Sequence, residues 1–159
     1  MRLAKRQPEN LEAYNLYLKG RALWNTRTKE NMTAAIADFE LALAKDPGFA
    51  LAHVGIADCY SMLAAYGYSP PIIAYPKAKK ELQTALKLNS GISEAHSSLG
   101  WVYYNYDWDW ENGKRAFEEA LRINPSNPEA NYWYSQLLMV NYDPLTMEQI
   151  NTAITLTPA

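Results

Sequence analysis

The chain has 159 residues, 48% hydrophobic and 20% charged, so it is long enough and apolar enough to fold around a core. The formal net charge of −2 at pH 7, with no dense cluster of Lys and Arg, argues against nucleic acid as a partner of this segment. No apolar run of about 18 residues occurs, so we expect no insertion into a membrane.

Helical periodicity predicts eight helices after a lead-in over residues 1–10, and the fold class is therefore all-α. Asp109 and Asp143 stand where helix N-caps are needed, and Pro144 suits the first position of a helix. In chain order the helices are expected over 11–25, 31–45, 48–65, 71–88, 92–105, 109–123, 127–140 and 144–156.

One pattern recurs in the second helix of each pair: a small residue, a bulky apolar residue four positions later, then Ala and an apolar residue three and four positions further on. The copies read Ala35-Phe39-Ala42-Leu43, Ala78-Leu82-Ala85-Leu86, Gly113-Phe117-Ala120-Leu121 and Thr146-Ile150-Ala153-Ile154. Five positions after the shared Ala comes a residue that can stop a helix: Pro47, Ser90, Pro125 and Pro158. The copies are 43, 35 and 33 residues apart, which indicates an internal repeat.

A second pattern precedes it in the first helix of each pair. Its clearest copy is His96-x-x-Leu99-Gly100-x-x-Tyr103, and the others are His53-x-x-Ile56-Ala57-x-x-Tyr60, Leu16-x-x-Lys19-Gly20-x-x-Leu23 and Asn131-x-x-Tyr134-Ser135-x-x-Leu138. The small residue at the Gly20, Ala57, Gly100 and Ser135 position lets the paired helices approach closely, and bulky side chains fill the grooves beside it.

The two patterns and their period resemble the tetratricopeptide repeat (TPR), whose first helix carries Trp-x-x-Leu-Gly-x-x-Tyr. The resemblance implies a right-handed superhelical solenoid of about four helix-turn-helix hairpins, because one hairpin cannot bury its own apolar face. It also implies a non-catalytic protein that binds a protein or peptide. The repeats would fall at about 11–47, 48–90, 91–125 and 126–159.

In TPR proteins the first helices line a concave groove, and fixed positions of each repeat point into it. The resemblance implies a peptide- or protein-binding groove lined by Tyr14, Tyr17, Arg21, Trp24, Asn25, Asp58, Met62, Trp101, Tyr104, Asn105, Tyr132 and Gln136. Such aromatic anchors suit an extended or helical peptide with apolar side chains. The alternative for Trp24, Trp101 and Tyr104 is packing between repeats.

The chaperone-tail clamp of some TPR proteins is not expected here. That clamp uses Lys, Asn and Arg at fixed positions to hold two carboxylates, whereas this sequence has Tyr17, Arg21, Gly55 and either Ser97 or Ser98 there. Arg21 remains able to meet a single carboxylate of a ligand.

Two segments depart from the repeat. Residues 66–76 make repeat 2 longer, either as a tolerated insertion or as a ligand-contacting rim formed by Tyr66, Tyr68 and Tyr75. In repeat 3, Trp108 and Trp110 either pack the inter-helix turn onto adjacent hairpins or contact a ligand directly.

The segments 49–60, 66–76 and 106–110 together resemble the TPR region that follows bacterial signalling modules, namely winged-helix regulators, adenylate cyclases and Ser/Thr kinases. This resemblance implies a fragment of a larger signalling or regulatory protein. Alternatives are a self-association module, with a homo-oligomer as product, and a small-molecule sensor. The single Cys59 favours a reducing compartment and hence the cytoplasm, with periplasmic placement open.

Nothing in the sequence predicts catalysis, a metal or a cofactor. His53 and His96 occupy the same repeat position without further ligands nearby, so structural roles are expected for both. Cys59 is expected to be a small buried hydrophobe, because no convincing catalytic triad surrounds it.

Overall fold

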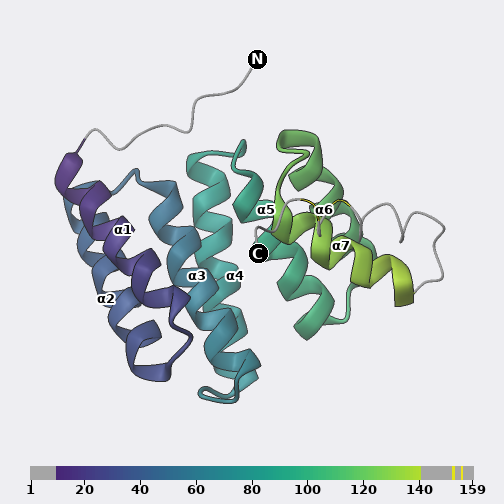
Figure 1. Ribbon diagram of the computed structural model, residues 1–159, viewed down its shortest axis with the longest axis horizontal. Helices are drawn as coiled ribbons and strands as arrows, with labels where there is room; N and C mark the ends of the chain where they lie inside the picture. The colour runs from purple at the N-terminus through teal and green to yellow at the C-terminus, as the bar shows by residue number, and fades with distance from the viewer. Residues whose placement is uncertain (1–9, 141–151, 153–154, 156–159) are drawn as a thin grey trace. The chain divides into compact units, whose positions relative to one another are not determined.

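The computed structural model describes residues 10–140 together with Thr152 and Thr155, and every regular element in that part of the chain is helical (Figure 1). The prediction of an all-α fold is confirmed. The chain divides into two compact units, Met1–Gly91 and Ile92–Ala159. The described elements are α1 (Leu11–Asn25), α2 (Lys29–Lys45), α3 (Ala50–Ala65), α4 (Pro71–Leu88), α5 (Ser93–Val102), the π-helical turn η1 (Tyr103–Asp107), α6 (Trp110–Ile123) and α7 (Pro128–Val140).

Helix bounds follow the capping side chains. α1 and α4 have the predicted bounds, whereas α2 begins two residues earlier than predicted. The reason is Thr28, whose hydroxyl accepts from the Asn31 N–H at 3.2 Å and so caps the helix. The predicted cap Asp109 is confirmed, since its carboxylate accepts from the Asn112 N–H at 3.1 Å.

The last expected helix, over 144–156 with Asp143 as its cap, lies outside the described residues apart from Thr152 and Thr155, which are both helical. None of the described helices is long and apolar enough to cross a membrane.

In the first unit the ring of Phe39 on α2 fills the space between α1 and α3. A Cβ on Gly20 would lie 2.7 Å from this ring, and a Cβ on Gly55 would lie 2.6 Å from it. Both distances are shorter than packed atoms allow. The repeat pattern predicted the small residue at position 20. The structure shows that Gly55 has the same role, so the Phe39 ring packs against glycines on both α1 and α3.

The insertion in repeat 2 forms a tight turn followed by a long helix. Gly67 has φ 72°, in the left-handed region, and the N–H groups of Tyr68 and Ser69 donate to the Leu63 carbonyl at 2.8 and 3.0 Å. Helix α4 then starts at Pro71 and contains Pro76 in its interior without ending there. The expected rim of three tyrosines is partly wrong: Tyr66 and Tyr68 are exposed, but Tyr75 is buried against the core.

In the second unit, α5 and α6 pack through the same small-to-large contact. A Cβ on Gly100 would lie 2.7 Å from the ring of Phe117, which is fully buried. Gly100 and Phe117 occupy the repeat positions of Gly20 and Phe39, so the predicted packing is confirmed in both units.

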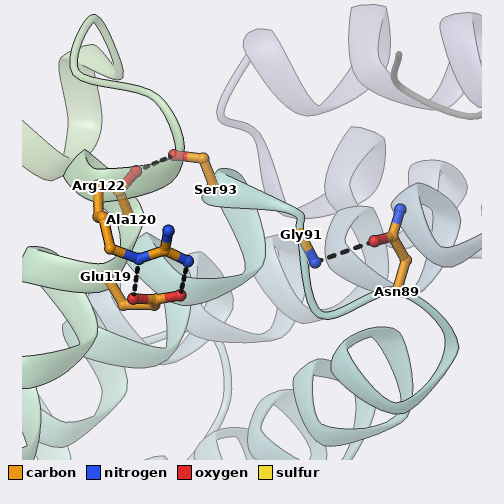
Figure 2. Close-up of polar contacts among 6 residues, drawn as sticks. All are labelled: Asn89, Gly91, Ser93, Glu119, Ala120 and Arg122. Atoms are coloured by element: carbon orange, nitrogen blue, oxygen red, sulfur yellow. Dashed lines mark hydrogen bonds and ion pairs between the residues drawn. The ribbon is translucent and has the colours of Figure 1, made fainter. Parts of the chain in front are cut away.

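Buried polar groups join three segments of this unit. The Ser93 hydroxyl donates to the Ala120 carbonyl at 2.8 Å (Figure 2) and accepts from the Asn127 side-chain amide at 2.8 Å. The side-chain oxygen of Asn127, Oδ1, in turn accepts from the Ala130 N–H at 3.0 Å and so caps α7. Because each group has a partner, burying them carries little desolvation penalty.

The first helix of repeat 3 does not run as predicted to residue 105. It changes after Val102 into η1, a π-helical turn, and Trp108 then adopts φ 55° and ψ 26°. The Asp109 N–H donates to the Tyr103 carbonyl at 3.0 Å, which closes the end of the helix. A π-turn widens the helix, and widened turns occur often at functional positions.

Candidate ligand-binding face

The first helices of successive repeats lie side by side within each unit, α1 with α3 and α5 with α7. We call the outward surface of each of these two pairs the first-helix face of its unit. Most predicted groove residues lie on these faces as half-buried or exposed side chains. They are Tyr14, Tyr17, Arg21, Trp24 and Asn25 on α1, Asp58 and Met62 on α3, Trp101 on α5, and Tyr132 and Gln136 on α7, while Tyr104 and Asn105 fall in η1.

An ion pair joins α1 to α3 on the face of the first unit. The Arg21 guanidinium donates to the Asp58 carboxylate at 2.7 Å, and the two side chains are 29% and 15% exposed. Burial by itself lowers the pKa of Arg21, but the charge of Asp58, the nearby Tyr17 and the hydrogen bond to Asp58 together raise that pKa above its usual value. Arg21 is therefore already neutralised within the fold, which weakens the expectation that it meets a ligand carboxylate.

Trp24 lies one helical turn beyond Arg21 and receives two guanidinium groups. The Cζ atom of Arg21 is 4.6 Å from the centre of its ring and that of Arg27 is 3.6 Å away. These are cation–π contacts. Arg27 was not among the predicted residues, because it lies in the turn after α1 with φ 59°, where helical spacing gives no prediction.

Two buried polar atoms on this face have no hydrogen-bond partner. They are Trp24 Nε1 and Ser61 Oγ. Arg21 of α1 pairs with Asp58 of α3, which lies 37 residues later in the sequence. Trp24 and Ser61 are also 37 residues apart, so these two residues lie at the same height along α1 and α3. A buried polar group without a partner is destabilising, so the fold leaves two hydrogen-bonding groups unsatisfied at this height of α1 and α3.

The tyrosines of α1 border the core. The ring centre of Tyr17 lies 5.1 Å from that of Phe49 and 5.8 Å from that of Phe39, while Tyr14 stacks on Tyr17 at 6.3 Å. Tyr17 therefore supports the packing as well as offering surface. Met62 also packs against the core, whereas Asn25 is exposed.

In the second unit the face is an aromatic cluster. The ring centres of Trp101 and Trp133 are 3.9 Å apart, and Tyr132 meets Trp133 edge-on at 4.7 Å. Tyr132 is 47% exposed, and Trp101 Nε1 is buried without a partner. Trp133 was missed by the sequence analysis because its repeat position is not among those that line the groove in TPR proteins.

Two other predicted groove residues in this unit are used by the fold. The Asn105 amide donates to the Trp101 carbonyl at 3.1 Å, and Tyr104 packs against the core cluster around Phe117. Gln136 is half-buried on α7. Trp101, Trp133 and Tyr132 thus supply most of the aromatic surface of this unit's face.

The titratable groups near the faces include a buried cysteine and a histidine that contacts a glutamate. Burial, followed by the charge of Asp58, raises the pKa of the Cys59 thiol strongly, so this cysteine stays protonated. His53 Nδ1 lies 2.6 Å from Glu81 Oε2, in a contact that joins α3 to α4. No group of His, Cys, Asp and Glu in the described part of the chain is arranged to hold a metal ion.

Comparison with solved structures places the fold among TPR proteins. The thermophilic TPR protein TTC0263 of Thermus thermophilus matches with a TM-score of 0.70 at 17% identity, over 92% of this chain and 71% of that one. The TPR domain of Sgt2 from Aspergillus fumigatus matches with a TM-score of 0.66 at 19% identity, over 94% and 87%. The first TPR of Spaghetti (RPAP3), solved with the HSP90 peptide SRMEEVD, matches with a TM-score of 0.65 at 19% identity, over 87% and 99%.

Comparison of the sequence with protein families and with curated proteins found no match.

Proposed function

We propose that this chain is a non-catalytic protein-interaction module that binds a peptide or protein segment on its first-helix faces. The observation that carries the proposal is the row of half-exposed aromatic side chains along α1, around the Arg21–Asp58 pair. Aromatic side chains lose little conformational entropy on binding and dominate many interfaces. The peptide bound to the first TPR of RPAP3 supports the proposal, because that fold can hold a peptide.

The ligand we propose has apolar or aromatic side chains rather than paired carboxylates. Arg21 is committed to Asp58 at 2.7 Å, so holding a carboxylate there would require breaking an existing charge pair.

Selection from a phage-displayed peptide library, followed by affinity measurement on the selected peptide, tests the proposal. Tyr14→Ala and Tyr132→Ala remove partly exposed rings from the two faces and should weaken binding by about tenfold each. Tyr66→Ala is the matched control, because it removes an exposed ring at the α3–α4 turn that is not among the predicted groove residues. Full affinity in Tyr14→Ala, Tyr132→Ala and the core-bordering Tyr17→Ala and Trp101→Ala would refute the proposed faces.

We further propose that the module belongs to a bacterial signalling or regulatory protein in the cytoplasm, as the resemblance of segments 49–60, 66–76 and 106–110 suggests. The reading frame around this segment tests the assignment. A kinase, cyclase or winged-helix domain encoded in the same frame would support it, whereas an unrelated enzyme would count against it.

Self-association is the second candidate function. It is favoured by exposed apolar side chains at the start of α4, where Ile72 and Ile73 are 74% and 50% exposed. Sedimentation equilibrium of the wild-type protein and of Ile72→Ser/Ile73→Ser tests it. A dimer that dissociates in the double variant supports this candidate, and a wild-type monomer at micromolar concentration removes it.

A further inference from the structure

The insertion in repeat 2 places four large apolar side chains in solvent. Tyr66 and Tyr68 in the turn are 50% and 44% exposed, and Ile72 and Ile73 in the first turn of α4 are 74% and 50% exposed. We call these four side chains the apolar tip. Isoleucine is among the residues most often found buried, so two consecutive exposed isoleucines indicate a surface that contacts something outside the chain.

The apolar tip is held in place by local structure. Figure 1 shows its turn at the end of the α3–α4 hairpin. The rings of Tyr66 and Tyr68 meet edge-on with their centres 6.1 Å apart. Pro70 and Pro71 fix φ at the start of α4. A surface that is ordered in advance loses little conformational entropy when it binds.

The other two hairpin turns in the described part of the chain lack such a tip. Residues 26–30, between α1 and α2, are all polar or charged. In repeat 3 Trp108 is 74% exposed, so the expectation that it packs its turn onto neighbouring hairpins is wrong, but Asp107 and Asp109 stand on either side of it in the sequence. The apolar tip is therefore specific to the insertion.

Beyond the tip, α4 is basic. It carries one acidic residue, Glu81, whose Oε2 atom lies 2.6 Å from His53 Nδ1. Its basic residues are Lys77, Lys79, Lys80 and Lys87. Ile73 and three of these lysines recur at helical spacing and are exposed, so they form one stripe along the helix: Ile73, Lys77, Lys80 and Lys87.

The lysines of this stripe lie at graded distances from the tip. An α-helix rises about 1.5 Å per residue, so Lys77 and Lys80 lie about 6 and 10 Å from Ile73 along the axis, and Lys87 about 21 Å. A negatively charged surface that touched the tip would attract the first two lysines strongly and Lys87 weakly, because the Debye length is roughly 8–10 Å. The Lys77 ammonium also lies 5.1 Å from the centre of the Tyr60 ring, and its side chain remains exposed.

We infer that the apolar tip docks on the surface of a lipid bilayer that contains anionic lipids. Ile72 and Ile73 enter the boundary of the acyl chains, and the tyrosine rings lie among the headgroups, where their apolar bodies and polar hydroxyls are both satisfied. Lys77 and Lys80 meet the phosphate groups. The contact is peripheral and needs no helix that spans the bilayer. It does not depend on peptide binding at the first-helix faces.

A second copy of the chain is the competing occupant of the tip. Pairing two tips about a two-fold axis would bring Lys77 and Lys80 of one copy toward those of the other, and like charges repel. The tip also has only four large side chains, whereas a stable protein interface uses about 20–30 residues a side. Both considerations favour the bilayer.

Co-sedimentation of the full chain with phosphatidylcholine vesicles, prepared with and without phosphatidylserine, tests the inference. We expect binding to be at least about tenfold tighter when phosphatidylserine is present. Ile72→Ser/Ile73→Ser should weaken that binding by about tenfold or more. Leu18→Ser/Leu41→Ser is the matched control, because these leucines are 47% and 52% exposed but belong to α1 and α2. It should change the affinity less than about twofold.

The lysine stripe supplies the control for charge. Lys77→Gln/Lys80→Gln should weaken binding to the phosphatidylserine vesicles by about tenfold or more. Lys87→Gln makes the same chemical change on the same stripe but farther from the tip, and it should change the affinity less than about twofold. All of the substituted side chains are exposed, so the variants should keep the melting temperature of the wild type.

Three results would overturn the inference: no binding of the wild type to the phosphatidylserine vesicles, full binding by Ile72→Ser/Ile73→Ser, or equal losses in Lys87→Gln and Lys77→Gln/Lys80→Gln. A dimer that dissociates in Ile72→Ser/Ile73→Ser, from a wild type that binds no vesicles, would assign the tip to a second copy and overturn it as well.

Discussion

The Arg21 guanidinium on α1 donates to the Asp58 carboxylate on α3 at 2.7 Å and so ties together the first helices of two successive hairpins. Both side chains are largely withdrawn from water, so removing either partner leaves the other charge poorly solvated. The pair therefore contributes to the stacking of repeats, in addition to its place on the proposed binding face.

Asp58→Asn and Arg21→Gln are each expected to lower the free energy of unfolding by about 1–3 kcal/mol. Because both variants break the same contact, the double variant should lose less than the sum of the two. Urea unfolding of the four proteins measures this coupling. Glu12→Gln serves as the control, because its pair with Lys45 is exposed and should contribute less than about 0.5 kcal/mol. Strict additivity of Asp58→Asn and Arg21→Gln would contradict the pair's stabilising role.

Gly20→Ala is expected to destabilise the first unit by about 1–3 kcal/mol through overpacking, since its Cβ would lie 2.7 Å from the Phe39 ring. Thermal unfolding of Gly20→Ala, of Phe39→Leu and of the double variant checks the cause. The smaller leucine should restore part of the loss that the alanine introduces. A double variant less stable than the sum of its single changes would exclude the steric explanation.

The thiol of Cys59 is expected to be unreactive in the folded protein at pH 8. Burial and the neighbouring charge of Asp58 raise its pKa, so the thiolate fraction is very small at that pH. Labelling with a disulfide reagent should proceed only as fast as the protein opens, and urea should restore an ordinary rate. Rapid labelling at pH 8 without denaturant would show that the thiol is accessible.

Asn127→Ala is expected to cost about 2 kcal/mol, because it deprives the Ser93 hydroxyl of a donor and the first turn of α7 of its cap. Asn124→Ala is the matched control, because its side chain accepts from the exposed Ser126 N–H at 3.1 Å and does not belong to the buried network. Chemical denaturation should separate the two variants clearly. Equal losses would show that the buried network adds nothing to an ordinary turn.

The repeat spacing was sufficient to predict the helical pairs and the close contacts at Gly20 and Gly100. These depend on helical periodicity and side-chain size, which a sequence displays directly. The bounds of α1 and α4 were also predicted, since Pro71 and the polar residues after Trp24 mark them.

The features that the sequence analysis missed depend on the path of the turns. A left-handed residue reverses the direction of its side chain, so periodicity could not place Arg27 on Trp24 or leave Trp108 in solvent. The burial of Tyr75 was also missed, because residues 66–76 were read as an insertion or rim whereas Tyr75 lies inside α4. Asn105 was expected to face a ligand, but the π-helical turn directs its amide to the Trp101 carbonyl.

The shared use of Phe39 has a consequence for dissecting the molecule. The Phe39 side chain packs against both Gly20 and Gly55, so repeats 1 and 2 share part of their core. A peptide ending at residue 47 would leave half of that ring in water and should not hold its shape alone. The smallest piece worth expressing from this half of the molecule therefore extends through α4.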